Sequence, residues 1–151
     1  MLIPLFLCIG FCIAVLYMDL VFDISALPYR KAKANLPKEV LDPIITYYRY
    51  ITKNPWLLFF VLLTTAISIT AEIVFKLVPD PIGYSSIALI GIVVMLGILR
   101  VIPTAQRLAS GKDTEEKQTS LVHSMFPYHI VLLILVLSLA LLQFSSTSTQ
   151  R

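Results

Sequence analysis

The chain has 151 residues, of which 58% are hydrophobic and only 14% are charged. Soluble domains usually carry about 25% charged residues, so this composition excludes an ordinary soluble globular protein. The net charge of +3 is small, and its distribution along the chain is more informative than its size.

Four long apolar stretches occur at residues 2–22, 55–78, 84–103 and 125–144. Each has about the length that a helix needs to cross roughly 30 Å of hydrocarbon at about 1.5 Å per residue. Helices are favoured over strands because a helix satisfies its backbone hydrogen bonds within one segment. The sequence therefore predicts an all-α polytopic membrane protein, with residues 1–151 forming a single four-helix transmembrane bundle.

We interpret the first stretch as a retained membrane helix rather than a cleaved signal peptide. No Lys or Arg precedes it, no clear small-x-small site follows it, and it is long for a signal core. Both cysteines, Cys8 and Cys12, lie inside it, which does not fit a secreted disulfide framework. We expect them to pack as small apolar residues, with thiol chemistry or palmitoylation as the alternative.

The connection over residues 23–54 is the only long one. Asp42-Pro43 is typical of an N-cap followed by a first-turn proline, and predicts a short helix over residues 43–53. Its apolar residues share one face, which favours an interfacial helix on the cytoplasmic leaflet. Neighbouring basic residues would add roughly 1 kcal/mol each of attraction to anionic lipid. Lipid or partner contact is expected at Arg30, Lys31, Lys33, Tyr47, Tyr48 and Arg49. In the alternative, the basic residues only fix topology and the helix packs on its own bundle.

The other connections are a tight turn at residues 79–83 and a solvated polar loop at residues 104–124. Ten of the twelve Lys and Arg residues lie in or beside the first and third connections, whereas only Lys76 and Arg151 lie on the opposite side. Basic residues concentrate in cytoplasmic loops. The first and third connections are therefore predicted to be cytoplasmic, and both termini lumenal or extracellular.

Charged groups inside membrane spans are rare because their insertion costs roughly 2.5–3.5 kcal/mol. Asp19, Asp23, Arg100 and His129 are all predicted to lie at the cytoplasmic level of the bundle, with Asp19–Arg100 as the expected pair. Two interpretations remain open: an ion pair that locks the first helix against the third, or a small polar functional site.

Near the opposite end, Glu72 and Lys76 have the i,i+4 spacing of an intrahelical pair, with the acid first. We expect them to form an intramembrane ion pair. A membrane carboxylate of a proton-coupled transporter is the alternative for Glu72.

No motif for metal binding, phosphate binding or nucleophilic catalysis is present, so no catalytic residue, metal or cofactor is assigned. His123 and His129 are six residues apart, with no third ligand in view.

The stretch from Arg100 to Leu108, which contains Pro103-Thr104, leads from a membrane helix into a loop, and residues 121–129 lead into the last span. Together they resemble the last third of the anthrone-oxygenase-like family of small four-helix membrane proteins. That family often has a Pro-Thr/Leu-Asn-x-x-Leu turn; here Ala105 or Gln106 replaces the Asn. The resemblance implies a four-helix bundle and oxygenation of a polycyclic aromatic substrate without an obvious cofactor.

Two classes of function follow. We favour a noncatalytic subunit that binds and stabilises a larger membrane complex, with or without lipid contact. Its expected partners are the bilayer and a membrane protein, and no nucleic acid is expected. The alternative is a small membrane enzyme or lipid-handling protein that uses the Asp19, Asp23, Arg100 and His129 group. The endoplasmic reticulum is the default location for a eukaryotic chain, and a bacterial inner membrane fits equally well.

Overall fold

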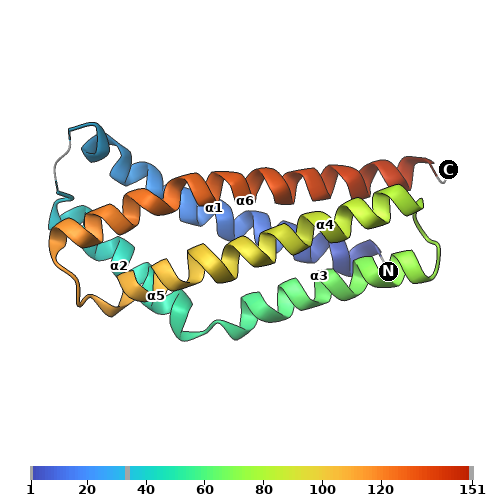
Figure 1. Ribbon diagram of the computed structural model, residues 1–151, viewed down its shortest axis with the longest axis horizontal. Coiled ribbons are helices and arrows are strands. Elements are labelled where there is room, and N and C mark those ends of the chain that lie inside the picture. Colours follow the sequence, from blue (N-terminus) through green and yellow to red (C-terminus); the bar gives the residue numbers. More distant parts are fainter. Residues whose placement is uncertain (1, 33–34, 150–151) are drawn as a thin grey trace.

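The computed structural model describes residues 2–32 and 35–149, and every regular element within them is helical. Four helical rods lie side by side in an elongated bundle (Figure 1). In chain order the rods are α1 (Leu2–Ala32); α2 (Lys38–Lys53) with α3 (Trp56–Val74); α4 (Asp80–Leu96), the π-helical η1 (Gly97–Val101) and α5 (Ile102–Ser110); and α6 (Glu115–Thr149). The predicted all-α class is confirmed, and four helices of the described chain are long and apolar enough to cross a membrane.

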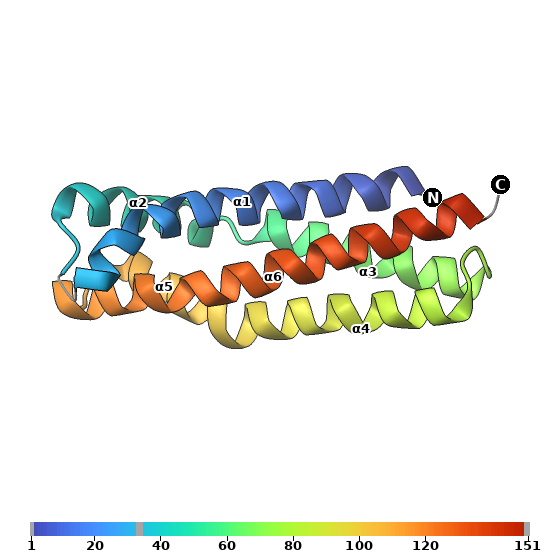
Figure 2. The same ribbon diagram turned by 90° about the horizontal axis from the view of Figure 1, so that it is seen from above.

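The two ends of the bundle contain different connections of the chain. The start of α1, the α3–α4 turn and the end of α6 lie together at one end, here called the termini end (Figure 2). The α1–α2 connection and the α5–α6 loop lie at the opposite end, here called the loop end. The chain therefore runs up, down, up and down with short connections, the arrangement typical of antiparallel four-helix bundles.

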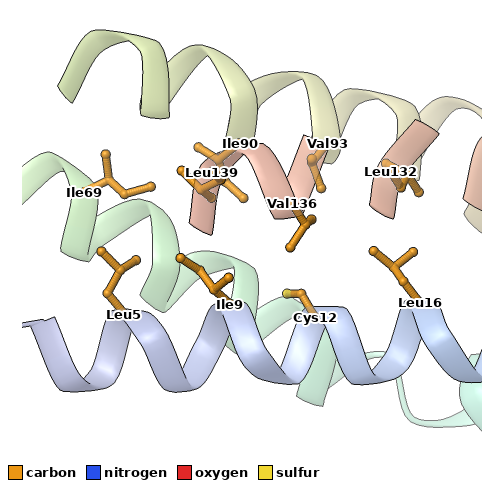
Figure 3. Close-up of a cluster of buried hydrophobic side chains, with 10 residues drawn as sticks. All are labelled: Leu5, Ile9, Cys12, Leu16, Ile69, Ile90, Val93, Leu132, Val136 and Leu139. Carbon is orange, nitrogen blue, oxygen red and sulfur yellow. The ribbon is translucent and has the colours of Figure 1, made fainter. Parts of the chain in front are cut away.

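Two hydrophobic cores are stacked along the bundle axis. The apolar core fills the half towards the termini end (Figure 3) and consists of Leu5, Ile9, Cys12, Leu16, Ile69, Ile90, Val93, Leu132, Val136 and Leu139. The loop-end core consists of Ala26, Leu36, Leu41, Ile44, Ile45, Tyr48, Ala105, Leu108, Val122 and Met125. Cys12 is buried and unpaired in the apolar core, which is the packing role expected for it.

Large hydrophobic side chains are also exposed, and nearly all of them surround the apolar core. Apart from Tyr50, those of the described chain lie within residues 3–24, 56–77, 84–102 and 131–144, and we call this surface the apolar belt. Soluble proteins rarely expose so continuous an apolar surface. The surface around the loop-end core is polar.

Helix α2 differs from the expected interfacial helix in position and length. It begins at Lys38 rather than near residue 43, with Pro37 as its N-cap, so Asp42 and Pro43 lie inside the helix. Instead of lying free on a leaflet, it packs along α5 and buries Leu41, Ile44, Ile45 and Tyr48. Its apolar face is thus covered by the chain itself, which corresponds to the packing alternative.

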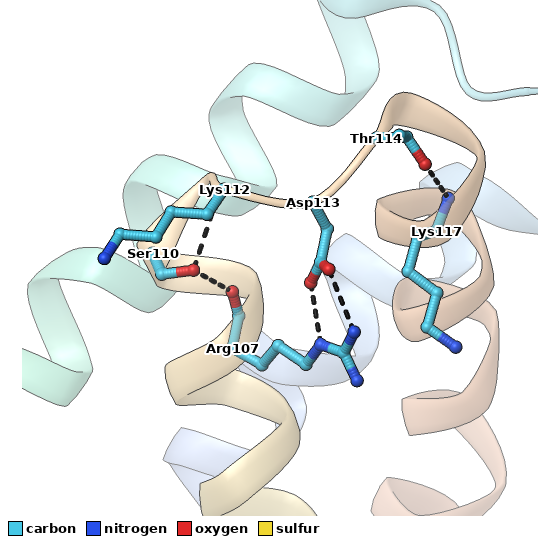
Figure 4. A network of polar contacts seen from close by, with 6 residues as sticks. All are labelled: Arg107, Ser110, Lys112, Asp113, Thr114 and Lys117. Atoms are coloured by element: carbon cyan, nitrogen blue, oxygen red, sulfur yellow. Dashed lines mark hydrogen bonds and ion pairs between the residues drawn. The ribbon is translucent and has the colours of Figure 1, made fainter.

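The segment expected as a polar loop over residues 104–124 is mostly helical, and only residues 111–114 separate α5 from α6. Arg107 Nε and Nη2 donate to the two carboxylate oxygens of Asp113 at 2.8 and 2.9 Å (Figure 4). Gly111 adopts the left-handed conformation that ends α5, with φ 62°. Thr114 Oγ1 accepts a hydrogen bond of 3.4 Å from the amide of Lys117, directly before α6 begins at Glu115. Local capping and a bidentate ion pair therefore shorten the connection.

The third rod changes from α- to π-helix over η1, where the amide of Ile102 donates to the carbonyl of Gly97. Pro103 follows at once and has no amide proton to donate to the carbonyl four residues earlier. A π-turn re-forms a hydrogen bond at this point and lets the rod continue into α5.

Candidate functional site

A polar layer separates the two cores. On α1, Asp19 and Asp23 lie between Leu16 of the apolar core and Ala26 of the loop-end core. On α6, His129 lies between buried residues of the two cores in the same way. The layer thus joins the first and last helices where the apolar belt gives way to the polar loop end.

His129 and Asp23 form the shortest contact of this layer. The imidazole Nδ1 lies 2.6 Å from Asp23 Oδ2, and the two residues are 0% and 2% exposed. When Asp23 is ionised its carboxylate can only accept hydrogen bonds, and Nδ1 is then the donor in this contact. This bond fixes the orientation of the ring.

Asp19 lies on the other side of the imidazole and binds α2. Its Oδ1 accepts a hydrogen bond of 2.9 Å from the Tyr47 hydroxyl. Its Oδ2 lies 3.9 Å from His129 Nε2, which is close enough for charge attraction and too far for a hydrogen bond. The Tyr47 ring packs against Phe22 with centroids 4.4 Å apart. The layer therefore connects α1, α2 and α6 through side chains alone.

The two tyrosines of α2 are perturbed by this environment. Burial, followed by the charge of Asp19, raises the pKa of Tyr47 above its ordinary value. The same causes raise the pKa of Tyr48. Tyr47 therefore remains a hydrogen-bond donor to Asp19 throughout the physiological range.

The chemistry open to this group is proton sharing and helix locking. Two carboxylates flank one imidazole, and within the described chain Asp23 Oδ1, His129 Nε2 and the Tyr48 hydroxyl have no hydrogen-bond partner. All three residues are nearly inaccessible to solvent. Breaking a buried charged pair of this kind typically costs about 3–5 kcal/mol.

Arg100 does not join the group, and the expected Asp19–Arg100 pair is wrong. Arg100 lies in η1 with its side chain on the surface, and no ion pair connects it to Asp19 or Asp23 within the described residues. From the end of the apolar belt the long Arg100 side chain can extend along the surface to water, whereas burial beside Asp19 would remove its hydration at a large cost. His129 is the side chain that contacts Asp19 and Asp23 instead.

The expected Glu72–Lys76 pair is also not formed, because α3 ends between the two residues. The amide of Leu77 donates to the carbonyl of Glu72 at 2.8 Å, and the amide of Lys76 to that of Ile73 at 3.1 Å. These bonds form a Schellman motif, in which Lys76 takes the left-handed conformation, with φ 54°. Lys76 Nζ consequently pairs with Asp80 at 2.8 Å, which raises the pKa of the lysine. Glu72 is left buried, and neither of its carboxyl oxygens has a hydrogen-bond partner in the described structure.

The six residues expected to contact lipid or a partner fall into three groups. Arg30 is exposed, and Arg49 Nε donates to the Ala109 carbonyl at 3.3 Å. Tyr47 is half-buried and donates to Asp19, whereas Tyr48 is buried in the loop-end core. Lys31 belongs to α1, but its side chain lies outside the described part, as does the whole of Lys33.

Two features were missed at the level of sequence. Tyr47 belongs to the polar layer, and nothing local in α2 indicates that it meets Asp19, 28 residues earlier. Near the termini end, Gln143 Nε2 donates to Ser86 Oγ at 2.9 Å, and both residues are fully buried. A glutamine within an apolar stretch was the available signal for this second contact. His123 Nε2 lies 3.2 Å from the carbonyl oxygen of Ala26.

Among the residues that the structure describes, no group of three or more His, Cys, Asp or Glu side chains is placed to hold a metal ion. No protein-family model, curated protein or solved structure matches the chain.

Proposed function

We propose that this chain is a small noncatalytic membrane subunit that binds and stabilises a larger membrane complex. The observation that carries this proposal is the closed state of the polar layer. His129 and Asp23 turn towards each other, and neither side chain is open to a substrate from solvent. Their arrangement is better suited to holding α1, α2 and α6 in register than to turnover.

The apolar belt supports a position within a bilayer. It surrounds the half of the bundle that contains the apolar core. Helix α6 has 35 residues, and therefore a length of about 52 Å at roughly 1.5 Å per residue. Hydrocarbon is about 30 Å thick, so roughly 20 Å of the loop end would stand beyond it.

The distribution of basic residues gives this arrangement a direction. In the sequence, ten of the twelve Lys and Arg residues lie in or beside the first and third connections, so we place the loop end in the cytoplasm and both termini on the other side. For a eukaryotic chain, the endoplasmic reticulum is the default location that we propose. Epitope tags at the two termini should be inaccessible from the cytosol of intact cells; accessible tags would reverse the orientation.

The subunit proposal is tested by purifying the tagged full chain in a mild detergent. We expect one larger membrane protein to co-purify in a fixed ratio, and the chain to be degraded faster in cells that lack it. His129→Gln should lower the amounts of folded chain and of complex in proportion. Recovery of the chain alone, at normal abundance, would contradict the proposal.

A small membrane enzyme or lipid-handling protein is the second candidate. It is favoured by His129 Nε2 and Asp23 Oδ1, which have no hydrogen-bond partner in the described chain and suit a proton-transfer role. In that case the purified chain should carry a lipid or an aromatic metabolite, and His129→Gln should leave it folded and at normal abundance but without activity.

A further inference from the structure

A second buried polar group lies at the termini end, separate from the layer around His129. Glu72, in the last turns of α3, is 1% exposed, and neither carboxyl oxygen has a hydrogen-bond partner within the described residues. Lys76, the side chain expected from the sequence to pair with Glu72, is bound to Asp80 instead. A buried carboxylate without a positive partner is unstable in a low-dielectric interior.

The helix register places two further polar residues at the level of Glu72. Ile69, Ile90 and Leu139 belong to the apolar core and lie close together in Figure 3. About one turn nearer the termini end, the same three helices carry Glu72, Ser86 and Gln143, all at most 1% exposed. The apolar core is therefore followed by a polar layer formed by α3, α4 and α6.

The unsatisfied atoms of this second layer are all acceptors. Gln143 uses its amide nitrogen on Ser86 Oγ, and its Oε1 has no partner in the described structure. With the two oxygens of Glu72, three buried oxygens are left without a donor. The ionisable side chains described on α1 and α4 in this half are Cys8, Cys12, Asp80 and Tyr84, and none of them is a cation. The positive charge that acts on Glu72 is that of the chain's α-amino group, which is not a hydrogen-bond partner of either carboxyl oxygen.

We propose that Glu72, with Gln143 and Ser86, forms a binding site for a small monovalent cation, a proton or Na⁺. The site contains oxygen ligands only, which suits hard cations rather than thiophilic metals. It carries one formal negative charge, which one monovalent ion balances, whereas Ca²⁺ sites usually combine six to eight oxygens. This site is independent of the proposed subunit function.

Dicyclohexylcarbodiimide tests the proposal on the full chain in detergent or membranes. This apolar reagent adds to a protonated carboxyl: the acid proton moves to one carbodiimide nitrogen and the acyl group ends on the other, with no leaving group. In Na⁺-free buffer we expect peptide mass spectrometry to find Glu72 modified at least tenfold more than the exposed Glu115 and Glu116. Glu72→Gln should remove the modification at that peptide.

The two ions are distinguished by competition. Protection of Glu72 by Na⁺, and not by choline at equal ionic strength, would identify an alkali-ion site. Modification that falls only as the pH rises would identify a proton site. For a Na⁺ site, Gln143→Leu should raise the protecting concentration by about tenfold, the effect of losing one ligand worth roughly 1.4 kcal/mol. The proposal is overturned if Glu72 is modified no more than Glu115 and Glu116 in Na⁺-free buffer.

Discussion

His129 and Asp23 are 106 residues apart in the sequence, and yet their side chains meet at 2.6 Å inside the bundle. Asp19 approaches the same imidazole from the other side and is itself held by Tyr47. The contact therefore reports on the mutual placement of the first and last helices. It lies at the boundary between the apolar core and the loop-end core, both of which contain buried residues of α1 and α6.

The first prediction is that Asp23→Ala will strongly destabilise the bundle, whereas Arg100→Ala will not. Removing Asp23 leaves a buried imidazole without its partner, which should lower the free energy of unfolding by about 3–5 kcal/mol. Arg100 is exposed and forms no ion pair with the layer, so its loss should change stability by less than about 0.5 kcal/mol. Reversible unfolding in mixed micelles measures both. Equal losses in the two variants would contradict the observed pairing.

The second prediction concerns the hydrogen bond from Tyr47 of α2 to Asp19 of α1. Tyr47→Phe keeps the ring packed on Phe22 but removes the hydrogen bond to Asp19. A hydrogen bond to a charged group contributes about 1.5–3 kcal/mol, and we expect a loss of that order. Tyr50→Phe is the matched control because the Tyr50 side chain is 73% exposed. If the two variants unfold at the same denaturant concentration, the hydroxyl of Tyr47 does not stabilise the layer.

The four long helices could be predicted from the sequence because hydropathy and length are local properties. The predicted topology alone places Asp19, Asp23 and His129 at one level of the bundle. The partner of the two carboxylates could not be predicted, because depth along the bundle does not specify the face on which a side chain lies. Arg100 and His129 are at similar depth, but only His129 points inwards. The i,i+4 spacing of Glu72 and Lys76 misled for a related reason, since it holds only while the helix continues, and α3 ends at Val74.

The same limit applies to α2. Its amphipathic pattern correctly indicated one apolar face, but a pattern does not identify what covers that face. Both a lipid leaflet and the neighbouring α5 satisfy it, and the structure has α5. Pro43 predicts the start of a helix because prolines favour the first turn. It lies instead within α2, where tertiary packing outweighs the local preference.

The third prediction is a pH dependence in the α5–α6 loop. The hydrogen bonds from Arg107 lower the pKa of Asp113. The contribution of this pair to stability should therefore be complete above the unfolded value of about 3.9 and be lost as the pH falls through the lowered folded value. Carboxyl NMR titration should show Asp113 shifting back upwards in Arg107→Gln. The Arg107 side chain is exposed, so added salt should weaken the lowering of the Asp113 pKa. An identical Asp113 titration in the unmodified chain and in Arg107→Gln would show that this bidentate ion pair does not form.

The last prediction compares two glycines of the same helix. In α4, a Cβ added at Gly83 would lie 2.6 Å from Ile73 Cγ1, whereas one added at Gly91 would meet nothing within 4 Å. Ile73 is β-branched and stiff, so Gly83→Ala must displace the close contact between α4 and α3 and should cost about 1–3 kcal/mol. Gly91→Ala adds helix propensity without a clash, and should be neutral or stabilising by up to about 1 kcal/mol. Thermal unfolding of the two variants side by side tests this difference. If Gly83→Ala is as stable as Gly91→Ala, the close approach of Gly83 to Ile73 does not set the spacing of α3 and α4 at the termini end.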